Sequence, residues 1–295
     1  MRVGLQIPIF RPSTPETMRS WLKDIAQAAD EGGFYSIWMM DHFLQLDHGM
    51  GGPETEMLEG YVTLGYLAGV TEKIRLGLMV GGTIYRHPAI VIKSISTLDV
   101  LSGGRAYFGI GAGWYEYECT SLGLPFPAMK VRFELLEEQL KIARQMFAGD
   151  TAPYQGKHFQ MERPINNPQP LQKPRVPILI GGMGPRKTLR FVAQYADATN
   201  FFGAAPDEMI KRRLETLKGH CADVGRPYEE IEKTALVTAN VPGVQGSPRG
   251  FDPIERARQL CAMGFEHIIF NLLSDYTLDA MKYFSGEVIP VVKEL

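Results

Sequence analysis

The chain has 295 residues, of which 45% are hydrophobic and 22% are charged, and its formal net charge is −2. This composition describes a globular protein with room for a sizeable core. It offers no basic excess for nucleic acid or for an anionic membrane surface, so we expect neither as a partner.

The three cysteines, Cys119, Cys221 and Cys261, form no C-x-x-C pair and cannot all pair with one another. We interpret them as structural thiols of a protein in the reducing cytoplasm. The N-terminal stretch is too short for the apolar part of a signal peptide and breaks at Pro8, so we expect it to form the first strand.

Short apolar runs alternate with amphipathic segments through the first half of the chain. Runs without polar alternation predict buried strands, and apolar residues at three- or four-residue spacing predict helices. The expected order is strand 3–9, helix 15–30, strand 36–40, helix 59–70, strand 74–80, helix 88–101 and strand 106–110. Residues 114–119 open no clear helix.

The same rhythm returns after a longer excursion. The stretch 149–177 is rich in Pro, Gly and Asn, which indicates a surface insertion with a short hairpin around 154–159. The other expected elements are helix 132–147, strand 177–180, helix 185–196, strand 198–202, helix 207–224, strand 234–241, helix 253–263, strand 267–271 and helix 277–295.

Eight strands alternating with eight helices predict an α/β fold, a single closed (β/α)8 barrel with an insertion region around 115–176. An open doubly wound sheet is the alternative. In the barrel, residues 1–295 form one domain, and functional side chains gather at the C-terminal ends of the strands.

A glycine turn follows the fourth predicted strand. Gly111, Ala112 and Gly113 remove side chains at the strand end, where a flat ligand can lie against the backbone. The spacing is G-x-G-x-G, which differs from the dinucleotide fingerprint G-x-G-x-x-G. A turn that serves only chain geometry is the alternative.

Asp41 and His42 end the second predicted strand. A histidine there can move a proton near neutral pH or donate a hydrogen bond to a ring carbonyl. The alternative is a histidine that caps the loop with Asp41 as its partner.

A second glycine-rich turn follows strand 177–180. Free backbone N–H groups, a helix N-terminus and a guanidinium converge there, which predicts a phosphate site. Its residues are Gly181, Gly182, Met183, Gly184 and Arg186. The alternative is a plain strand-to-helix turn with solvated cations. No spacing of histidines or carboxylates indicates a metal site, and we expect none.

Several stretches taken in order carry a family likeness: Leu5–Pro8, Ser36–His42, Gly82–Pro88, Ser102–Trp114, Tyr154–Phe159, Pro177–Gly182 and Tyr195–Ala198. Together they resemble the luciferase-like monooxygenase superfamily, and more narrowly its branch dependent on coenzyme F420, a deazaflavin. The resemblance covers nearly the whole chain. It implies a (β/α)8 barrel with a flavin-type ring in its mouth, and a homodimer.

The resemblance also implies roles for single residues. His42, beside Asp41, would face the reactive ring. Met79, Val80, Gly81 and Gly82 would hold a non-prolyl cis peptide against the back of the ring. The turn 111–113 would line the ring edge, and the turn 181–186 would bind the phosphate end of the cofactor.

The expected function is that of an F420-dependent oxidoreductase, which transfers a hydride between the reduced deazaflavin and a small organic substrate. His42 would supply or orient the proton, and the loops 43–56 and 242–250 would help exclude water. An FMN-dependent monooxygenase and a catalytically idle flavin-binding protein are the alternatives. Trp114 and Leu46 stand where the sugar-phosphate dehydrogenases of the family have glutamate and tryptophan, so Trp114 is expected to form an apolar substrate wall instead.

Overall fold

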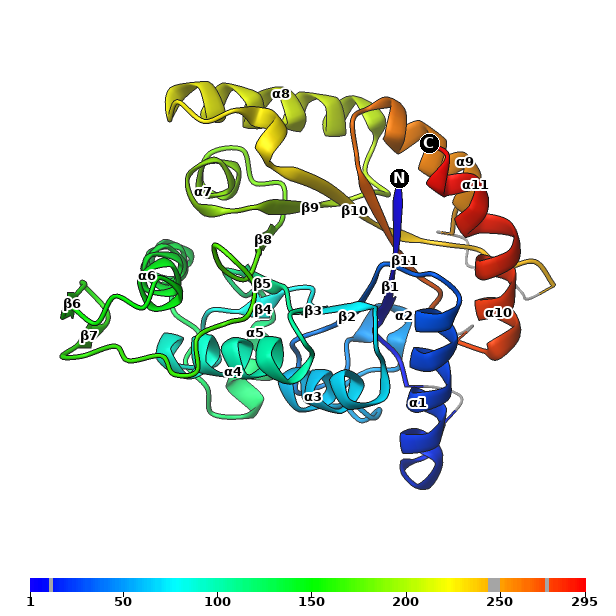
Figure 1. Cartoon of the computed structure of the whole chain (residues 1–295), viewed down its shortest axis with the longest axis horizontal. Helices are drawn as coiled ribbons and strands as arrows, with labels where there is room; N and C mark the ends of the chain where they lie inside the picture. Colours follow the sequence, from blue (N-terminus) through cyan, green and yellow to red (C-terminus); the bar gives the residue numbers. More distant parts are fainter. Residues whose placement is uncertain (11–12, 244–249, 274–275) are drawn as a thin grey trace.

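The computed structural model describes residues 1–10, 13–243, 250–273 and 276–295. Its main sheet is parallel, with the strand order β3-β2-β1-β11-β10-β9-β8-β5-β4. A parallel bridge between Leu76 and Ala106 joins β3 to the segment that leads into β5, so the sheet closes on itself. Figure 1 shows the strands in the centre and the helices around them. The predicted (β/α)8 barrel is confirmed.

The first half of the barrel contains the predicted elements and two short additions. Its elements are β1 (Arg2–Ile7), α1 (Pro15–Glu31), β2 (Ser36–Met39), α2 (Asp47–Met50), α3 (Gly60–Val70), β3 (Arg75–Leu78), β4 (Gly81–Gly82), α4 (Pro88–Leu101) and β5 (Phe108–Gly111). The strands are buried because the helices cover their outer faces, while their inner faces fill the barrel.

The second half begins with α5 (Glu116–Ser121), α6 (Met129–Phe147) and the hairpin of β6 (Tyr154–Gln155) and β7 (Gln160–Met161). The barrel then continues with β8 (Ile178–Gly181), α7 (Thr188–Tyr195), β9 (Ala198–Phe202), α8 (Asp207–Asp223), β10 (Glu232–Thr238), α9 (Pro253–Ala262), β11 (His267–Asn271), α10 (Leu278–Tyr283) and α11 (Ile289–Lys293). A 3₁₀ turn at Tyr228–Glu230 precedes β10.

The predicted strand 74–80 is shorter in the structure, and the separate strand β4 follows it. β3 ends at Leu78 and pairs with β2, whereas β4 pairs with β5, so the chain changes partner between them. The cis peptide expected in this region lies between Met79 and Val80. The switch brings Gly81 and Gly82 to the inner rim of the barrel, beside Gly111.

The helices differ from the prediction in three places: one begins later, one is interrupted and one was not expected. Helix α7 begins at Thr188, because Pro185 to Lys187 form a turn in which Leu189 N–H bonds to the Gly184 carbonyl. The helix expected over 277–295 is interrupted by a π-helical turn at Phe284–Val288. Pro290 follows this turn and lacks the N–H that a regular α-helix would use. Residues 116–121, expected to be irregular, form α5.

The insertion region is fastened to the barrel through buried carboxylates. Glu138 on α6 accepts hydrogen bonds from the backbone N–H groups of Lys157, His158 and Phe159 in the hairpin. Asp99 on α4 accepts from the N–H groups of residues 171 and 172. The hairpin therefore stands outside α6, at the left edge of Figure 1, without disturbing the barrel.

A polar cluster fills the N-terminal end of the barrel. His267 Nδ1 lies 2.9 Å from Glu232 Oε1, and His267 Nε2 lies 2.9 Å from Ser36 Oγ. Trp38 donates its indole N–H to the same Ser36 oxygen at 2.7 Å. Burial lowers the pKa of His267 against the opposing effect of Glu232. Every contact fits a neutral imidazole, which donates from Nδ1 and accepts at Nε2.

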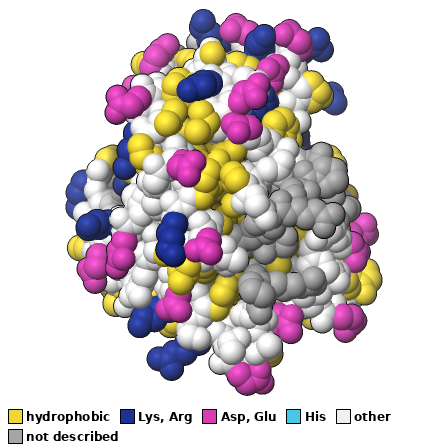
Figure 2. All heavy atoms as spheres, turned by 90° about the vertical axis from the view of Figure 1, so that its right-hand side faces the viewer, with side chains coloured by type: hydrophobic (Ala, Val, Ile, Leu, Met, Phe, Trp, Pro, Cys, Tyr) yellow, Lys and Arg dark blue, Asp and Glu magenta, His cyan; other side chains and the backbone are white. Residues whose placement is uncertain are grey.

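The outer surface mixes both signs of charge. Figure 2 shows acidic and basic side chains interspersed on the face that it presents. Among the described residues, no helix is both long enough and apolar enough to cross a membrane.

Candidate active site

A cavity of about 470 Å³ opens at the C-terminal ends of the strands. The structure brings most of the predicted site residues together around it: Asp41, His42, Met79, Val80, Gly81, Gly82, Gly111, Ala112, Gly113, Trp114, Gly181 and Gly182. The cavity lies where a (β/α)8 barrel carries its active site. Met183, Gly184 and Arg186 do not line it within the described part of the chain.

One wall of the cavity is made of backbone. Gly81 begins β4, whereas Gly111 and Gly181 end β5 and β8. The side chain of Val80, which itself lines the cavity, packs against Gly111 and Gly181. A Cβ atom added at Gly111 or Gly181 would lie 2.9 Å from a Val80 methyl group, closer than real Cβ atoms come to another heavy atom. The missing side chains leave a smooth surface that suits the face of a planar ring.

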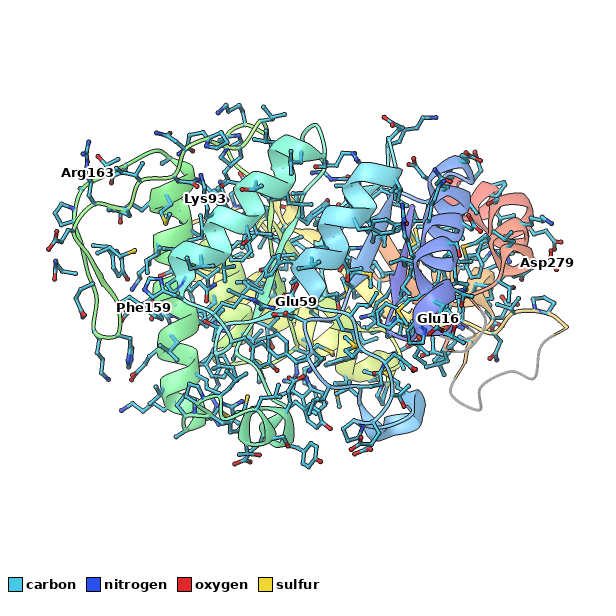
Figure 3. All side chains as sticks on the ribbon, turned by 90° about the horizontal axis from the view of Figure 1, so that it is seen from below. Glu16, Glu59, Lys93, Phe159, Arg163 and Asp279 are labelled. Carbon is cyan, nitrogen blue, oxygen red and sulfur yellow. The ribbon has the colours of Figure 1, made fainter. Side chains whose placement is uncertain are left out.

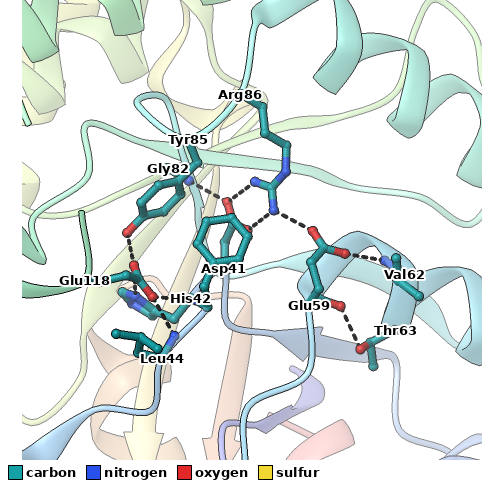
Figure 4. A network of polar contacts seen from close by, with 11 residues as sticks. Asp41, His42, Leu44, Glu59, Val62, Thr63, Gly82, Tyr85, Arg86 and Glu118 are labelled. Atoms are coloured by element: carbon teal, nitrogen blue, oxygen red, sulfur yellow. Dashed lines mark hydrogen bonds and ion pairs between the residues drawn. The ribbon is translucent and has the colours of Figure 1, made fainter. Parts of the chain in front are cut away.

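His42 is held by a carboxylate from another element. Its Nδ1 lies 3.1 Å from Oε2 of Glu118 on α5 (Figure 4). A carboxylate only accepts hydrogen bonds, so the imidazole donates from Nδ1 and leaves Nε2 free of this contact. The partner of His42 is therefore Glu118, not Asp41 as the loop-cap alternative assumed.

Glu118 is fully buried and accepts several hydrogen bonds. Tyr85 donates its hydroxyl at 2.5 Å, Leu44 donates its backbone N–H at 2.9 Å, and Phe43 donates its backbone N–H to the same oxygen as Leu44. Burial by itself would raise the pKa of Glu118, but the hydrogen bonds from His42, Tyr85 and Leu44 lower it below its ordinary value. Glu118 is thus held as an anion.

Asp41 binds the backbone of Gly82 beside the glycine wall. Its two oxygens accept one hydrogen bond each from the Arg86 guanidinium, both at 2.9 Å, and Gly82 N–H adds another at 2.9 Å. Arg86 also bonds to Glu59, which caps α3 (Figure 4). Burial acts to lower the pKa of Arg86, but Asp41 raises it on balance. The pair fixes the position of β4.

The predicted phosphate turn is divided between two hollows. Gly181 and Gly182 line the main cavity, whereas Gly184 and Arg186 line a neighbouring pocket of about 510 Å³ together with Lys130 and Lys187. Because α7 begins three residues later than predicted, Arg186 lies in the exposed turn before the helix. Met183 accepts a hydrogen bond at its sulfur from Phe202 N–H.

Trp114 lies at the rim. Its side chain is 54% exposed, and its ring meets the His42 ring edge-on at a centroid distance of 5.7 Å. From the loop 43–56, Leu46 and Met50 also line the cavity. Of the predicted covering loop 242–250, residues 244–249 lie outside the described part of the chain.

The opposite wall carries amide side chains that the sequence did not single out. They are Gln6 in β1, Asn200 in β9, which is the cross-strand neighbour of Gly181, and Asn271 at the end of β11. Glu118 and Arg86 were missed as well. Arg86 had a usable signal, because it stands between a predicted strand end and the next helix, whereas Glu118 was hidden in a stretch with no helical periodicity.

Comparisons with known proteins agree with this geometry. A family model described as luciferase-like monooxygenase matches residues 1–241. An F420-dependent glucose-6-phosphate dehydrogenase of Nakamurella multipartita is 28% identical over 225 residues, which cover 76% of this chain and 64% of that protein. The pyrimidine monooxygenase RutA of Stutzerimonas stutzeri is 32% identical over 243 residues, which cover 77% of this chain and 65% of that protein.

Among solved structures, an F420-dependent secondary alcohol dehydrogenase in complex with an F420–acetone adduct superimposes with a TM-score of 0.81. It is 20% identical, and the match covers 99% of this chain and 98% of that chain, which supports the fold. The chain spans slightly less than two thirds of the length of the two curated relatives. Since the family model matches well over half of its residues, the protein belongs to the luciferase-like monooxygenase family.

Proposed function

We propose that the protein is an oxidoreductase that uses coenzyme F420 and transfers a hydride between the reduced deazaflavin and a small organic substrate. The observation that carries this proposal is one cavity lined both by the glycine wall and by a buried, carboxylate-held histidine. Relatives named as F420-dependent dehydrogenases support the choice of cofactor.

The residues present fit a flavin-type ring. A Cβ at position 111 or 181 would meet the side chain of Val80, which lines the cavity, so the absence of side chains there keeps this wall flat. In this proposal the glycine wall together with Ala112 and Gly113 would hold the ring. Gly182 and the neighbouring basic pocket around Arg186 then accept the anionic end of the cofactor.

When bound, the reduced deazaflavin supplies the hydride. His42 supplies or removes the accompanying proton at Nε2, because Glu118 holds its Nδ1–H. Glu118 also fixes the plane of the His42 imidazole, since its other oxygen accepts a hydrogen bond from the backbone N–H of Leu44. Trp114, Leu46 and Met50 cover the open side with apolar surface and exclude water from the reacting atoms.

An FMN-dependent monooxygenase is the second candidate, and the similarity to a pyrimidine monooxygenase favours it. A catalytically idle flavin-binding protein is a third. Two single-turnover experiments separate the three, one without oxygen on protein loaded with reduced F420 and one with oxygen on protein loaded with reduced FMN. Protein loaded with reduced F420 is mixed with an activated enone, and the oxidation of the cofactor is followed in a single turnover.

We expect enone-dependent oxidation of F420 without oxygen. Oxygen-dependent turnover with reduced FMN and none with F420 would support the monooxygenase. Tight binding of either cofactor without turnover of any acceptor would support the idle binding protein.

We also propose a homodimer formed through α3 and α4, which lie side by side in Figure 3. α3 is apolar on nearly all sides, and Val62 on it is 75% exposed. A Cβ at Gly65 or Gly69 would meet no described atom within 4 Å, so a second helix can approach closely. Apolar helices of this kind are normally covered.

The dimer is tested by light scattering on the wild type and on Val62→Glu. We expect a wild-type dimer and a variant monomer with an unchanged circular dichroism spectrum. A wild-type monomer at micromolar concentration would contradict the interface. We further propose a cytoplasmic location, in keeping with the three free cysteines.

A further inference from the structure

We propose that the amide wall formed by Gln6, Asn200 and Asn271 is the substrate subsite, and that it selects an uncharged amide or lactam with a free N–H. This inference rests on the proposed function, because it assumes that the flavin-type ring occupies the opposite glycine wall. It names the substrate class that the same cavity takes.

The two walls belong to separate arcs of the barrel. The glycine wall comes from β4, β5 and β8, which are adjacent in the sheet. The amide wall comes from β9, β11 and β1, with β10 between β9 and β11 in the order around the barrel. Register places Gln6 next to the pair Leu5–Phe270, so Gln6 and Asn271 are neighbours across β1 and β11. A substrate between the arcs touches the ring on one side and the amides on the other.

Asn271 has an unused acceptor. Its side chain is 7% exposed and lines the cavity, and its Oδ1 has no hydrogen-bond partner in the described part of the chain. Buried polar atoms are nearly always paired, and an unpaired one at a cavity wall indicates a missing donor. An N–H group of a ligand supplies that donor.

Asn200 offers a second acceptor to the same cavity. Its Nδ2 donates to Thr234 Oγ1 at 2.8 Å, which fixes the orientation of the amide and leaves Oδ1 as its remaining acceptor. Gln6 is 3% exposed, lines the same wall and carries both a donor and an acceptor. An amide or lactam, which offers one N–H and one C=O side by side, matches this mixture of groups.

The cavity is unsuited to an anionic substrate. Of the residues that the structure describes, those lining it include no Lys and no Arg. The carboxylate among them, Asp41, is already occupied by Arg86 and Gly82. A phosphorylated substrate would lose its hydration without gaining a counter-charge, which is costly. Leu236 and Phe202 add apolar surface between the amides, suited to the carbon skeleton of a small neutral ring.

The proposal is tested by calorimetric binding with three probes. δ-Valerolactam carries N–H and C=O, its N-methyl derivative keeps only the C=O, and glucose 6-phosphate is a dianion. Each is titrated into protein loaded with oxidised F420, into protein loaded with FMN, and into protein free of both. The affinity for the lactam is therefore measured whichever cofactor the protein binds. A failure of F420 binding, which would count against the proposed function, is thus distinguished from a failure of the lactam proposal.

We expect δ-valerolactam to bind about tenfold more tightly than its N-methyl derivative, the effect of one net hydrogen bond. Asn271→Leu should remove that preference and leave the affinity for the cofactor unchanged. Asn166→Leu is the matched control, because Asn166 is also buried with an unpaired Oδ1 but does not line the cavity. It should keep the preference for the lactam.

Three results overturn the proposal. Equal binding of the lactam and its N-methyl derivative shows that no acceptor reads the N–H. Tighter binding of glucose 6-phosphate shows a cationic subsite. Weaker cofactor binding in Asn271→Leu, with the lactam preference intact, assigns the amide wall to the pyrimidine edge of the cofactor instead.

Discussion

Nδ1 of His42 lies 3.1 Å from Oε2 of Glu118, so a strand end of the barrel is joined to a helix that begins two residues after Trp114. Because a carboxylate only accepts, the contact places a proton on Nδ1 of His42 and leaves Nε2 for proton transfer. It also ties His42 to the hydroxyl of Tyr85 through the shared carboxylate oxygen.

Replacement of His42 by Ala is predicted to lower single-turnover reduction by about 10²-fold or more, the loss expected for a general acid or base. The melting temperature and the affinity for the cofactor should stay close to those of the wild type. A parallel fall in affinity would mean that His42 only positions the ring. A folded, cofactor-loaded variant with the wild-type rate would end the catalytic assignment.

Replacement of Glu118 by Gln is predicted to lower kcat by about tenfold, less than the loss of the acid itself, because Glu118 acts through His42. KM should change little, since the carboxylate does not line the cavity. Tyr85→Phe is the control that keeps the carboxylate and removes one donor, and its loss should be smaller. A lower melting temperature of Glu118→Gln, with an unchanged kcat per folded molecule, would show that Glu118 has a purely structural role.

Replacement of Gly181 by Ala is predicted to weaken cofactor binding about tenfold, because the new methyl group displaces the side chain of Val80, which lines the cavity. Gly219→Ala on α8 is the control, since its Cβ would meet nothing within 4 Å among the described atoms. That change should raise stability by about 1 kcal/mol and leave binding unchanged. Equal affinities in the two variants would refute the assigned position of the ring.

Stability is predicted to fall on acidification because of the polar cluster at the N-terminal end of the barrel. Burial lowers the pKa of His267 from its ordinary value of 6.5, so its contribution is complete above pH 6.5 and is lost as the pH falls below it. The pKa of Glu232 is also lowered: burial opposes the shift, but His267 and Arg2 outweigh it. Its contribution is lost at still lower pH, as the pH falls below the ordinary value of 4.5.

The measurement is the melting temperature between pH 8 and pH 4 for the wild type and for His267→Gln. The variant should be less stable at pH 7 and should show a shallower fall between pH 6.5 and pH 5. Parallel curves for the two proteins would show that His267 does not titrate on unfolding.

The sequence predicted the barrel because its periodicities are local and its strands are fully buried, as Ile37 and Phe270 illustrate. The glycine positions of the cavity were also predictable, since glycine at a strand end has few other uses. Glu118 and Asn271 were not, because their roles depend on contacts between segments far apart in the chain. The boundary of α7 failed because Pro185 suits a turn as well as a first helical turn.

The most direct test of the account is an equilibrium titration of the purified protein with coenzyme F420 and, separately, with FMN. We expect saturable binding of F420 at one site per chain, at least about tenfold tighter than that of FMN, and weakened by Gly181→Ala. Saturable binding of FMN with none of F420 would contradict it.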